Sequence, residues 1–394
     1  MSNPVVSVII PTHERAKYAI PTIRLMLSLH CDIEVVVCDS SSEDRITPEL
    51  RGTTNLSRLR LIRPGKVLSI VDNFNTALAA ATGKYLTIIG DDDFVSEDIV
   101  TVANWAEKNQ IDSIKFSFPT CYYWPDFHHK TRGNFFAGTL RTRPFTGKVI
   151  QHDAKAASLN ALANFGRGVM EMPRAYAGLV SMDLVKRIQQ KYGALFGGVS
   201  PDIYSSFLIS QEARKCVYID YPIIIPGSSG LSAAGQSANG KHVGKLRDNA
   251  HIRPFNDLEW HPLIPEFYSV PTVWSFSLLK AVEKHGKLID NVNFPSLYLK
   301  CLIFHKSYSL ETFKSIQNYY QQKHIKIRFQ HFSGELINDA SWIVEKVKAK
   351  IFKQISSNIQ ENVTLNVNNA IEAASVMSEQ LAKQSKLTLP VLQV

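Results

Sequence analysis

The sequence predicts an α/β fold, in which a mainly parallel sheet carries helices on both faces and a helical C-terminal region follows. Two observations lead to this prediction. Within the first 118 residues, short apolar segments typical of buried strands alternate with segments of helical spacing, and such alternation produces parallel sheets. The chain also has 394 residues, 45% of them hydrophobic, which is enough for a sizeable core and more than one domain.

The predicted elements follow one another in a regular order. Strands are expected over 5–11, 33–40, 58–64, 84–90 and 111–118, and helices over 18–30, 69–82 and 96–109. Gly83 directly follows the second helix, as glycines that end helices do. Ligands of such sheets bind beyond the carboxyl ends of the strands. We therefore expect three polar segments to share one rim of the sheet, namely 11–15, 39–42 and 91–93.

Three consecutive aspartates, Asp91, Asp92 and Asp93, follow the apolar strand that ends at residue 90. Their repulsion is relieved by a divalent cation, and carboxylate oxygens suit Mg²⁺ or Mn²⁺, which also bind phosphate oxygens. The alternative is that they open a loop and favour the N-terminus of the helix near Ser96. Asp39 ends the second strand, where a carboxylate can bind a ribose or a base edge; its alternative is an ordinary turn residue.

Three segments of the first 118 residues resemble, in order and spacing, the opening motifs of family-2 glycosyltransferases: SVIIPTHERAKYAIPTIRLML, VVVCDSSSED and NFNTALAAATGKYLTIIGDDD. The resemblance is strong over about 5–118, weak over 170–235 and absent from the last third. It implies a GT-A fold that binds a nucleotide-sugar donor together with Mn²⁺ or Mg²⁺. One departure is visible, since the usual acidic pair and glycine after the second strand are replaced here by the run CDSS, which leaves one carboxylate, Asp39.

The resemblance also implies roles for single residues. Asp91 would face the ribose or the sugar, Asp93 would hold the metal that bridges the diphosphate, and Asp39 would contact the base or ribose. The other donor-binding candidates are Pro11, Thr12, Glu14, Arg15 and Asp92. Uridine diphosphate, the commonest donor carrier of the family, is the expected nucleotide.

Sugar transfer with inversion needs a general base for the acceptor hydroxyl, and the family takes it from an acidic residue that begins a helix. The segment GGVSPDIYSSFLIS (197–210) has this form, with Ser200 and Pro201 suited to a helix start and Asp202 in the first turn. We predict Asp202 as the base; the alternative is that it only favours the helix dipole. Asp183 is a rival carboxylate that is read more simply as a helix-start residue.

The segment 119–136 is the candidate acceptor wall. It is rich in aromatic side chains, which can stack on sugar rings, and Tyr122, Tyr123 and Trp124 are the predicted acceptor contacts. The alternative is a packed loop with surface histidines.

A second candidate loop, 225–245, is rich in Gly, Ser and Ala. This composition predicts a mobile lid that offers Lys241, His242 and Lys245 to the diphosphate or the metal, with a plain linker as the alternative. His242 is the candidate second metal ligand.

These features divide the chain into a nucleotide-sugar-binding half (1–118), an acceptor half with base and lid (119–265) and a mainly helical region (266–394). In the last region, 342–355 combines an apolar face with lysines elsewhere, the pattern of a basic amphipathic helix. This pattern predicts peripheral membrane contact near a lipid-linked acceptor. Packing within a helical domain or a homo-oligomer is the alternative.

Composition excludes some classes of protein. The net charge of +9 favours anionic partners, but no motif dedicated to nucleic acid is present. The five cysteines are scattered without C-x-x-C spacing, which favours a reducing compartment. No segment approaches the roughly 18 to 20 apolar residues of a membrane span. We therefore expect a cytoplasmic protein, with the inner face of the membrane as its place of peripheral contact.

The expected function is metal-assisted, single-displacement transfer of a sugar from a nucleotide diphosphate sugar to a glycan or lipid-linked glycan. A sugar nucleotidyltransferase is one alternative, but it would normally carry a glycine-rich basic loop after the first strand, and THERAK has no glycine. A non-catalytic glycan-binding protein on the same scaffold is another. Retention of Asp91, Asp93 and Asp202 argues against it.

Overall fold

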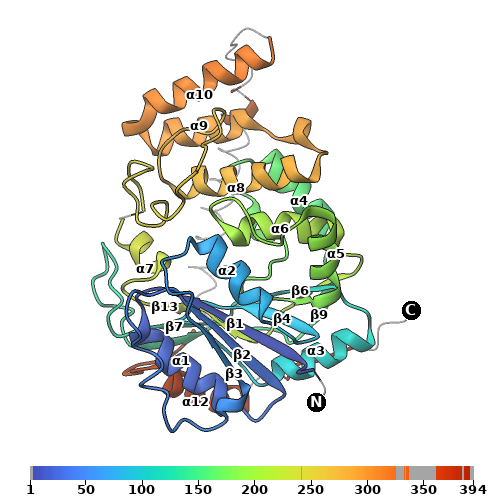
Figure 1. Cartoon of the computed structure of the whole chain (residues 1–394), viewed down its shortest axis with the longest axis vertical. Helices are drawn as coiled ribbons and strands as arrows, with labels where there is room; N and C mark the ends of the chain where they lie inside the picture. The colour runs from blue at the N-terminus through green and yellow to red at the C-terminus, as the bar shows by residue number, and fades with distance from the viewer. Residues whose placement is uncertain are drawn as a thin grey trace.

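The computed structural model describes residues 3–240, 242–324, 332, 334–336, 361–383 and 386–390. A large sheet occupies one end of the molecule and a stack of helices, α8 to α10, occupies the other (Figure 1). The segment 342–355, predicted as a basic amphipathic helix, lies outside the described residues.

Within the described ranges, eight strands form the main sheet in the order β3-β2-β1-β4-β10-β6-β11-β9. Strands β10 and β9 run antiparallel to their neighbours, and the remaining strands share one direction. The sheet is therefore mainly parallel, as predicted. The strands are β1 Val6–Thr12, β2 Ile33–Asp39, β3 Leu59–Ile62, β4 Tyr85–Ile88, β6 Ser113–Phe116, β9 Val149–Gln151, β10 Gly178–Ser181 and β11 Cys216–Ile219.

Two smaller sheets lie beside the strand ends. In one, β5 pairs with β12; in the other, the order is β13-β7-β8-β14. Their strands are β5 Phe94–Val95, β7 Thr120–Tyr123, β8 Thr139–Thr142, β12 Ile224–Ile225, β13 Gly227–Ser228 and β14 Asn362–Thr364. Strand β12 thus lies against β5, directly after the three aspartates, and β13 lies against β7.

Helices cover both faces of the main sheet, because successive strand residues point to opposite faces and both sets are apolar. Ile9 and Val36 face a core shared with α2, α4, α5 and α6, while Val8 and Val35 face a core shared with α1, α3 and α12. The described helices are α1 Ala16–Ser28, α2 Ile70–Ala79, α3 Asp98–Lys108, α4 Ala154–Ala163, α5 Met182–Tyr192, α6 Pro201–Glu212, α7 Ala233–Ala238, α8 Val270–His285, α9 Phe294–Phe304, α10 Ser309–Gln322 and α12 Ala370–Leu381, with short 3-10 turns η1 Leu56–Arg58, η2 Val169–Glu171, η3 Ile289–Asn291 and η4 Lys306–Tyr308. The α/β prediction, with a helical C-terminal region, is confirmed.

The C-terminal region has two separate parts. Helices α8 to α10 extend the core on the α6 side, where Phe276 and Leu297 join it. Helix α12 instead returns to the sheet and lies against α1, as Figure 1 shows. Among the described residues, no helix is both long and apolar enough to cross a membrane.

Candidate functional site

The predicted polar segments meet at one rim of the main sheet. Thr12 and Asp39, the last residues of β1 and β2, are paired in the strand register. Strand β4, which runs parallel to β1, ends just before the aspartate loop, defined here as Asp91–Asp93. Parallel strands deliver their carboxyl ends to the same edge, so residues 27 to 79 positions apart become neighbours.

Asp91 is held by the loop that follows β1. The Thr12 hydroxyl donates to Asp91 Oδ2 at 2.6 Å, and Arg15 Nε donates to Oδ1 at 2.7 Å. Arg15 also reaches the next carboxylate, with its Nη2 atom 3.0 Å from Asp92 Oδ2. One guanidinium therefore bridges two of the three aspartates.

Asp92 and Asp93 are bound by the segment that follows β12. Ser229 donates to Asp92 Oδ2 through its hydroxyl at 2.6 Å and its backbone N–H at 3.2 Å. Asp93 Oδ1 accepts from the Gly227 N–H at 2.7 Å, and its Oδ2 accepts from the Gly90 N–H at 2.7 Å. The segment around Gly227 thus fixes the rotamers of both carboxylates.

The electrostatics of the loop are unfavourable for three free carboxylates. Each aspartate is only 4–5% exposed, and burial raises the pKa of Asp91 to about 6 and that of Asp93 to about 7, helped by the charge of Asp92. Burial alone would lower the pKa of Arg15, but the charges of Asp91 and Asp92 raise it. Three buried carboxylates against one guanidinium leave an excess of negative charge.

This excess suits a divalent cation. Mg²⁺ and its analogues are usually held by one or two carboxylates together with substrate phosphates and water. In the described part of the chain, no group of three or more His, Cys, Asp or Glu side chains is arranged to hold a metal ion by itself. The oxygen chemistry of the aspartate loop therefore fits Mn²⁺ or Mg²⁺.

Two buried polar atoms beside the loop have no hydrogen-bond partner among the described residues: Arg15 Nη1 and Asn73 Oδ1. The amide nitrogen of Asn73 is bound to the Thr12 carbonyl and the Ser40 hydroxyl, so its oxygen is directed elsewhere. An unpaired buried donor or acceptor costs roughly 1–3 kcal/mol. Of the two, Arg15 Nη1 belongs to the guanidinium that pairs with Asp91 and Asp92.

Asp39 is bound by an arginine that the sequence did not single out. Arg63 Nη1 donates to Asp39 Oδ2 at 2.7 Å, and the Ser41 N–H donates to Oδ1 at 3.0 Å. Asp39 is 1% exposed, whereas 23% of the Arg63 side chain is exposed. At this strand end the guanidinium, rather than the carboxylate, is presented to the surface.

Glu14 lies at the outer side of the rim. It has a positive φ of 55°, and its Oε1 atom accepts from the Ser42 N–H at 2.8 Å and the Ser42 hydroxyl at 2.7 Å. These hydrogen bonds lower the pKa of Glu14. Glu14 therefore ties the loop after Pro11 to the loop after β2.

Tyr176 is a site residue that sequence reasoning missed. Its hydroxyl donates to Asp93 Oδ2 at 3.2 Å, and its ring stacks on Phe74. Burial and the charges of Asp93, Asp92 and Asp202 raise its pKa. Tyr176 precedes β10, which is antiparallel to β4 and so begins where β4 ends. Only the antiparallel direction of β10 brings it to this rim.

Asp202 lies in the first turn of α6, as predicted. The negative charge of Asp202 acts to raise the pKa of both Tyr176 and His251. Asp202 therefore lies on the Tyr176 side of the aspartate loop. The turn before α6 is fixed from two directions. The Ser277 hydroxyl accepts from the backbone N–H of Ser200 at 2.8 Å, and His251 Nε2 donates to the carbonyl of the residue before Ser200 at 2.6 Å.

Asp183 lies at the opposite rim. It is in the first turn of α5, directly after Ser181, and Ser181 pairs with Tyr85 at the beginning of β4. The aspartate loop follows the other end of β4. Asp183 and Asp202, the two rival candidates for the base, therefore lie at opposite rims of the main sheet.

The predicted acceptor wall needs a correction. Tyr122 and Trp124 are buried in the core, at 0% and 3% exposure, so they have no surface to offer to an acceptor. Tyr122 donates to the Val367 carbonyl, and Trp124 Nε1 donates to the Asp92 carbonyl at 3.0 Å. Trp124 therefore holds the backbone of the aspartate loop from the core side. Tyr123 is half-buried and stacks on Phe136.

Part of the predicted lid, 225–245, packs against the aspartate loop and is regular in structure. Its beginning, at Gly227 and Ser229, is bound to the aspartate loop, and α7 follows. The His242 ring packs against Tyr268, and burial, together with the charge of His251, lowers the pKa of His242. Lys245 is exposed, and Lys241 lies outside the described residues.

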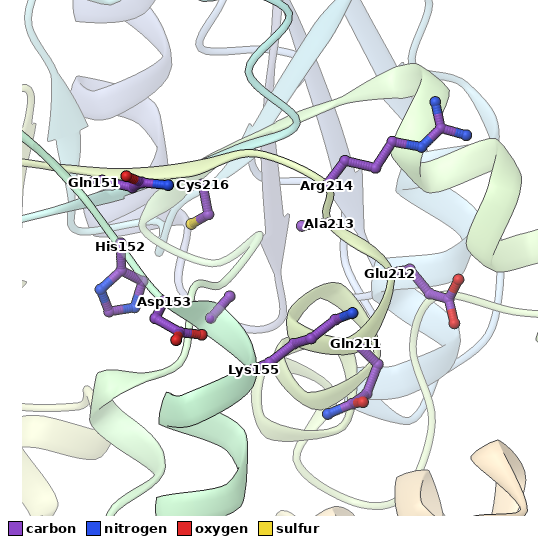
Figure 2. A pocket seen from close by; sticks show the side chains of 10 residues that line it. Gln151, His152, Asp153, Lys155, Gln211, Glu212, Ala213, Arg214 and Cys216 are labelled. Atoms are coloured by element: carbon purple, nitrogen blue, oxygen red, sulfur yellow. The ribbon is translucent and has the colours of Figure 1, made fainter.

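A pocket of about 630 Å³ lies away from this site (Figure 2). It is lined by Gln151–Lys155 and Gln211–Arg214 with Cys216. Cys216 begins β11, whose partner β6 begins at the same rim as β4. The pocket therefore opens at the amino-terminal rim, opposite the aspartate loop.

The family model described as glycosyl transferase family 2 matches residues 7–161. No curated protein matches the chain. Among solved structures, S. aureus TarS 1–349 in complex with UDP-GlcNAc has 15% identity and a TM-score of 0.42, covering 82% of this chain and 93% of that chain. The mannosyltransferase PcManGT from Pyrobaculum calidifontis, in complex with GDP-Man and Mn²⁺, has 13% identity and a TM-score of 0.38, covering 98% and 89%. A longer TarS structure matches at 15% identity and a TM-score of 0.38 over 57% of this chain, which spans only 37% of that one.

The family match begins within β1 and ends within α4, so it includes the strand ends that carry Thr12, Asp39 and the aspartate loop. With the sheet order described above, it supports the GT-A type of fold that the sequence resemblance implied. Residues 7–161 are thus similar to glycosyl transferase family 2, across the strand ends that carry the candidate site.

Proposed function

We propose that the protein transfers a sugar from a nucleotide diphosphate sugar to a hydroxyl of a glycan or lipid-linked glycan acceptor. The observation that carries the proposal is the buried aspartate loop, in which three carboxylates have one guanidinium, paired with Asp91 and Asp92, at strand ends within the family-2 match. An excess of buried negative charge suits a divalent cation, and through it a diphosphate. A purely structural loop has no need of that excess.

The donor is proposed to lie across the rim formed by β1, β2 and β4. Asp91 would bind the ribose or the sugar, and the unpaired Arg15 Nη1 supports a polar ligand beside it. Asp39, which is paired with Arg63, would contact the base or the ribose. The other donor contacts proposed are Pro11, Thr12, Glu14 and Asp92. Uridine diphosphate is the proposed carrier, on the strength of the sequence resemblance.

Mn²⁺ or Mg²⁺ is the proposed cofactor, with Asp93 as its principal protein ligand. His242, whose buried Nδ1 has no hydrogen-bond partner in the described part of the chain, is the proposed second ligand. When bound, the cation would neutralise the charge that develops on the departing nucleoside diphosphate. Tyr176 and the Gly227 N–H would keep the Asp93 carboxylate in position.

Asp202 is the proposed general base. It would accept the proton of the acceptor hydroxyl as the oxygen attacks the anomeric carbon from the side opposite the diphosphate, so the anomeric configuration inverts. Support comes from the fixed start of α6, where Ser277 and His251 hold the preceding turn. Tyr123, the half-buried member of the three predicted aromatic contacts, is the acceptor contact that remains proposed.

The test is a screen of nucleotide sugars for nucleoside diphosphate release in the presence of Mn²⁺. We expect release from one donor class, most strongly from UDP-sugars, and its loss in Asp93→Asn. Asp183→Asn is the matched control, since it makes the same chemical change at the opposite rim. Formation of pyrophosphate from a sugar phosphate and a nucleoside triphosphate would instead identify a nucleotidyltransferase. Nucleotide-sugar binding without any turnover would identify a binding protein.

A further inference from the structure

The corner where α9 passes into α10 exposes an unusual amount of apolar surface. Four large apolar side chains lie within eleven consecutive residues, and we call them the apolar corner: Ile303, Phe304, Leu310 and Phe313. They are 39%, 65%, 81% and 52% exposed, respectively. Single exposed apolar residues are ordinary on protein surfaces, but several large ones within one short stretch of chain point to an interaction site.

The helix geometry shows that the corner is not an extension of the core. On α10 the buried residues are Thr312, Ser315, Ile316 and Tyr320, which form the face that packs inward. Leu310 and Phe313, three residues apart, lie together on the other face. Phe304 ends α9, and the turn η4 joins it to α10. The turn between α9 and α10, which these residues flank, belongs to the helical end of the molecule (Figure 1).

The charges around the corner are mostly positive. Lys306 and Lys314 are exposed, and neither forms an ion pair with any residue that the structure describes. Glu311 is the single acidic residue within the same stretch. The chain as a whole carries +9, and the sequence beyond α10 contains the basic apolar segment 342–355. The positive charges of the corner and of the segment 342–355 repel each other, so this segment is a poor partner for the corner. The corner and the segment are each suited to a negatively charged surface.

We propose that the apolar corner docks on an anionic membrane surface. Phe304, Leu310 and Phe313 would enter the boundary between headgroups and acyl chains, while Lys306 and Lys314 contact lipid phosphates. Apolar side chains with flanking lysines are the composition of proteins that lie on a membrane without spanning it. The proposal does not depend on the transferase activity, because it concerns binding to lipid alone.

Co-sedimentation with lipid vesicles tests the proposal directly. The full chain is mixed with phosphatidylcholine vesicles that contain or lack phosphatidylglycerol. We expect binding only when the anionic lipid is present, and at least a tenfold loss in the triple variant Phe304→Ser, Leu310→Ser, Phe313→Ser. The double variant Lys306→Glu, Lys314→Glu should lose at least roughly fivefold for each lysine, the factor that corresponds to one basic residue near such a surface.

A matched control removes equally exposed apolar side chains elsewhere: Ile150→Ser, Leu365→Ser and Ile371→Ser, which are 56%, 62% and 46% exposed. This control should bind like the wild type. The single variant Leu310→Ser keeps the test valid if the triple variant does not fold. As a second readout, the tryptophan emission of Phe304→Trp should shift to the blue when anionic vesicles are added.

Two results would overturn the proposal. One is equal vesicle binding by the wild type and the triple variant, or no binding by either. The other is a change in oligomeric state, measured by light scattering, in the triple variant without any effect on vesicle binding, which would assign the corner to an interface between proteins.

Discussion

At the scale of single residues, the site depends on how each aspartate of the loop is held. Thr12, Arg15 and Ser229 donate to Asp91 and Asp92, yet burial still raises the pKa of Asp91. Buried carboxylates with elevated pKa values are frequent at functional sites, because burial and neighbouring charges that cost stability are kept there for binding or catalysis. The same reasoning gives the hydroxyl of Tyr176 a role in orienting Asp93.

The raised pKa of Asp93 predicts that stability depends on pH when no divalent cation is present. The folded state keeps a proton that the unfolded state loses, so the free energy of unfolding should fall as pH rises from about 4 to about 7. Urea unfolding in EDTA at several pH values measures this fall. Asp93→Asn should reduce the fall to the part contributed by the raised pKa of Asp91, and Asp183→Asn should keep the whole fall. A fall that is the same in wild type and Asp93→Asn would contradict the prediction.

Replacing the proposed base tests Asp202 separately from donor binding. Asp202→Asn keeps the shape of the side chain and removes the proton acceptor, so kcat should fall by roughly 10² to 10⁴ while the donor Kd is unchanged. Asp183→Asn is again the control. Turnover at the wild-type rate, or a product that retains the donor's anomeric configuration, would rule out this role for Asp202.

At the scale of elements, the strand β13 and the residues after it fix the aspartate loop. Gly227 lies so close to the loop that an added Cβ atom would stand 1.8 Å from the Asp92 carbonyl oxygen. Only a residue without a side chain allows the Gly227 N–H to reach Asp93. The glycine-rich composition of this segment therefore serves close packing at Gly227 as well as the flexibility expected of a lid.

Gly227→Ala should accordingly destabilise the protein. The clash is with backbone, which cannot move aside as a flexible side chain would, so we expect a loss of about 1–3 kcal/mol in the free energy of unfolding and weaker donor binding. Gly244→Ala is the control, because nothing lies within 4 Å of its added Cβ. Urea unfolding of both variants measures the difference. Equal midpoints would show that the segment yields readily.

At the scale of the whole molecule, the helical end and the sheet share one core. Phe207 of α6, Phe276 of α8 and Leu297 of α9 belong to the same apolar cluster as Val36 of β2. Ser277 of α8 also binds the turn that precedes Asp202. The helices beyond residue 266 therefore support the proposed catalytic half rather than standing apart from it.

This shared core predicts a single cooperative unfolding transition for the full chain. Far-UV and near-UV circular dichroism should give the same midpoint in urea. Phe276→Ala truncates a buried side chain, so it should lower the free energy of unfolding by roughly 3–5 kcal/mol. Both midpoints should then shift together to lower urea concentration. Two separate transitions would show that α8 to α10 fold as an independent unit.

Local sequence patterns were enough to predict the main strands and helices of the first 118 residues, although not the short strand β5, and to place Thr12, Asp39 and the aspartate loop at strand ends. Apolar periodicity identifies strands, and parallel direction then gives their carboxyl ends a common rim. The sequence also indicated a helix start at Asp202, because Ser200 and Pro201 are local signals. These are properties of short stretches of chain.

Only the tertiary structure decided which distant residues complete the site. Arg63 binds Asp39, Tyr176 binds Asp93 and Ser229 binds Asp92, across 24, 83 and 137 positions. It also buried Tyr122 and Trp124, which composition alone had suggested as acceptor contacts. Such contacts depend on strand order and on the reversed direction of β10, and both are set by packing of the whole chain, which leaves no local pattern in the sequence.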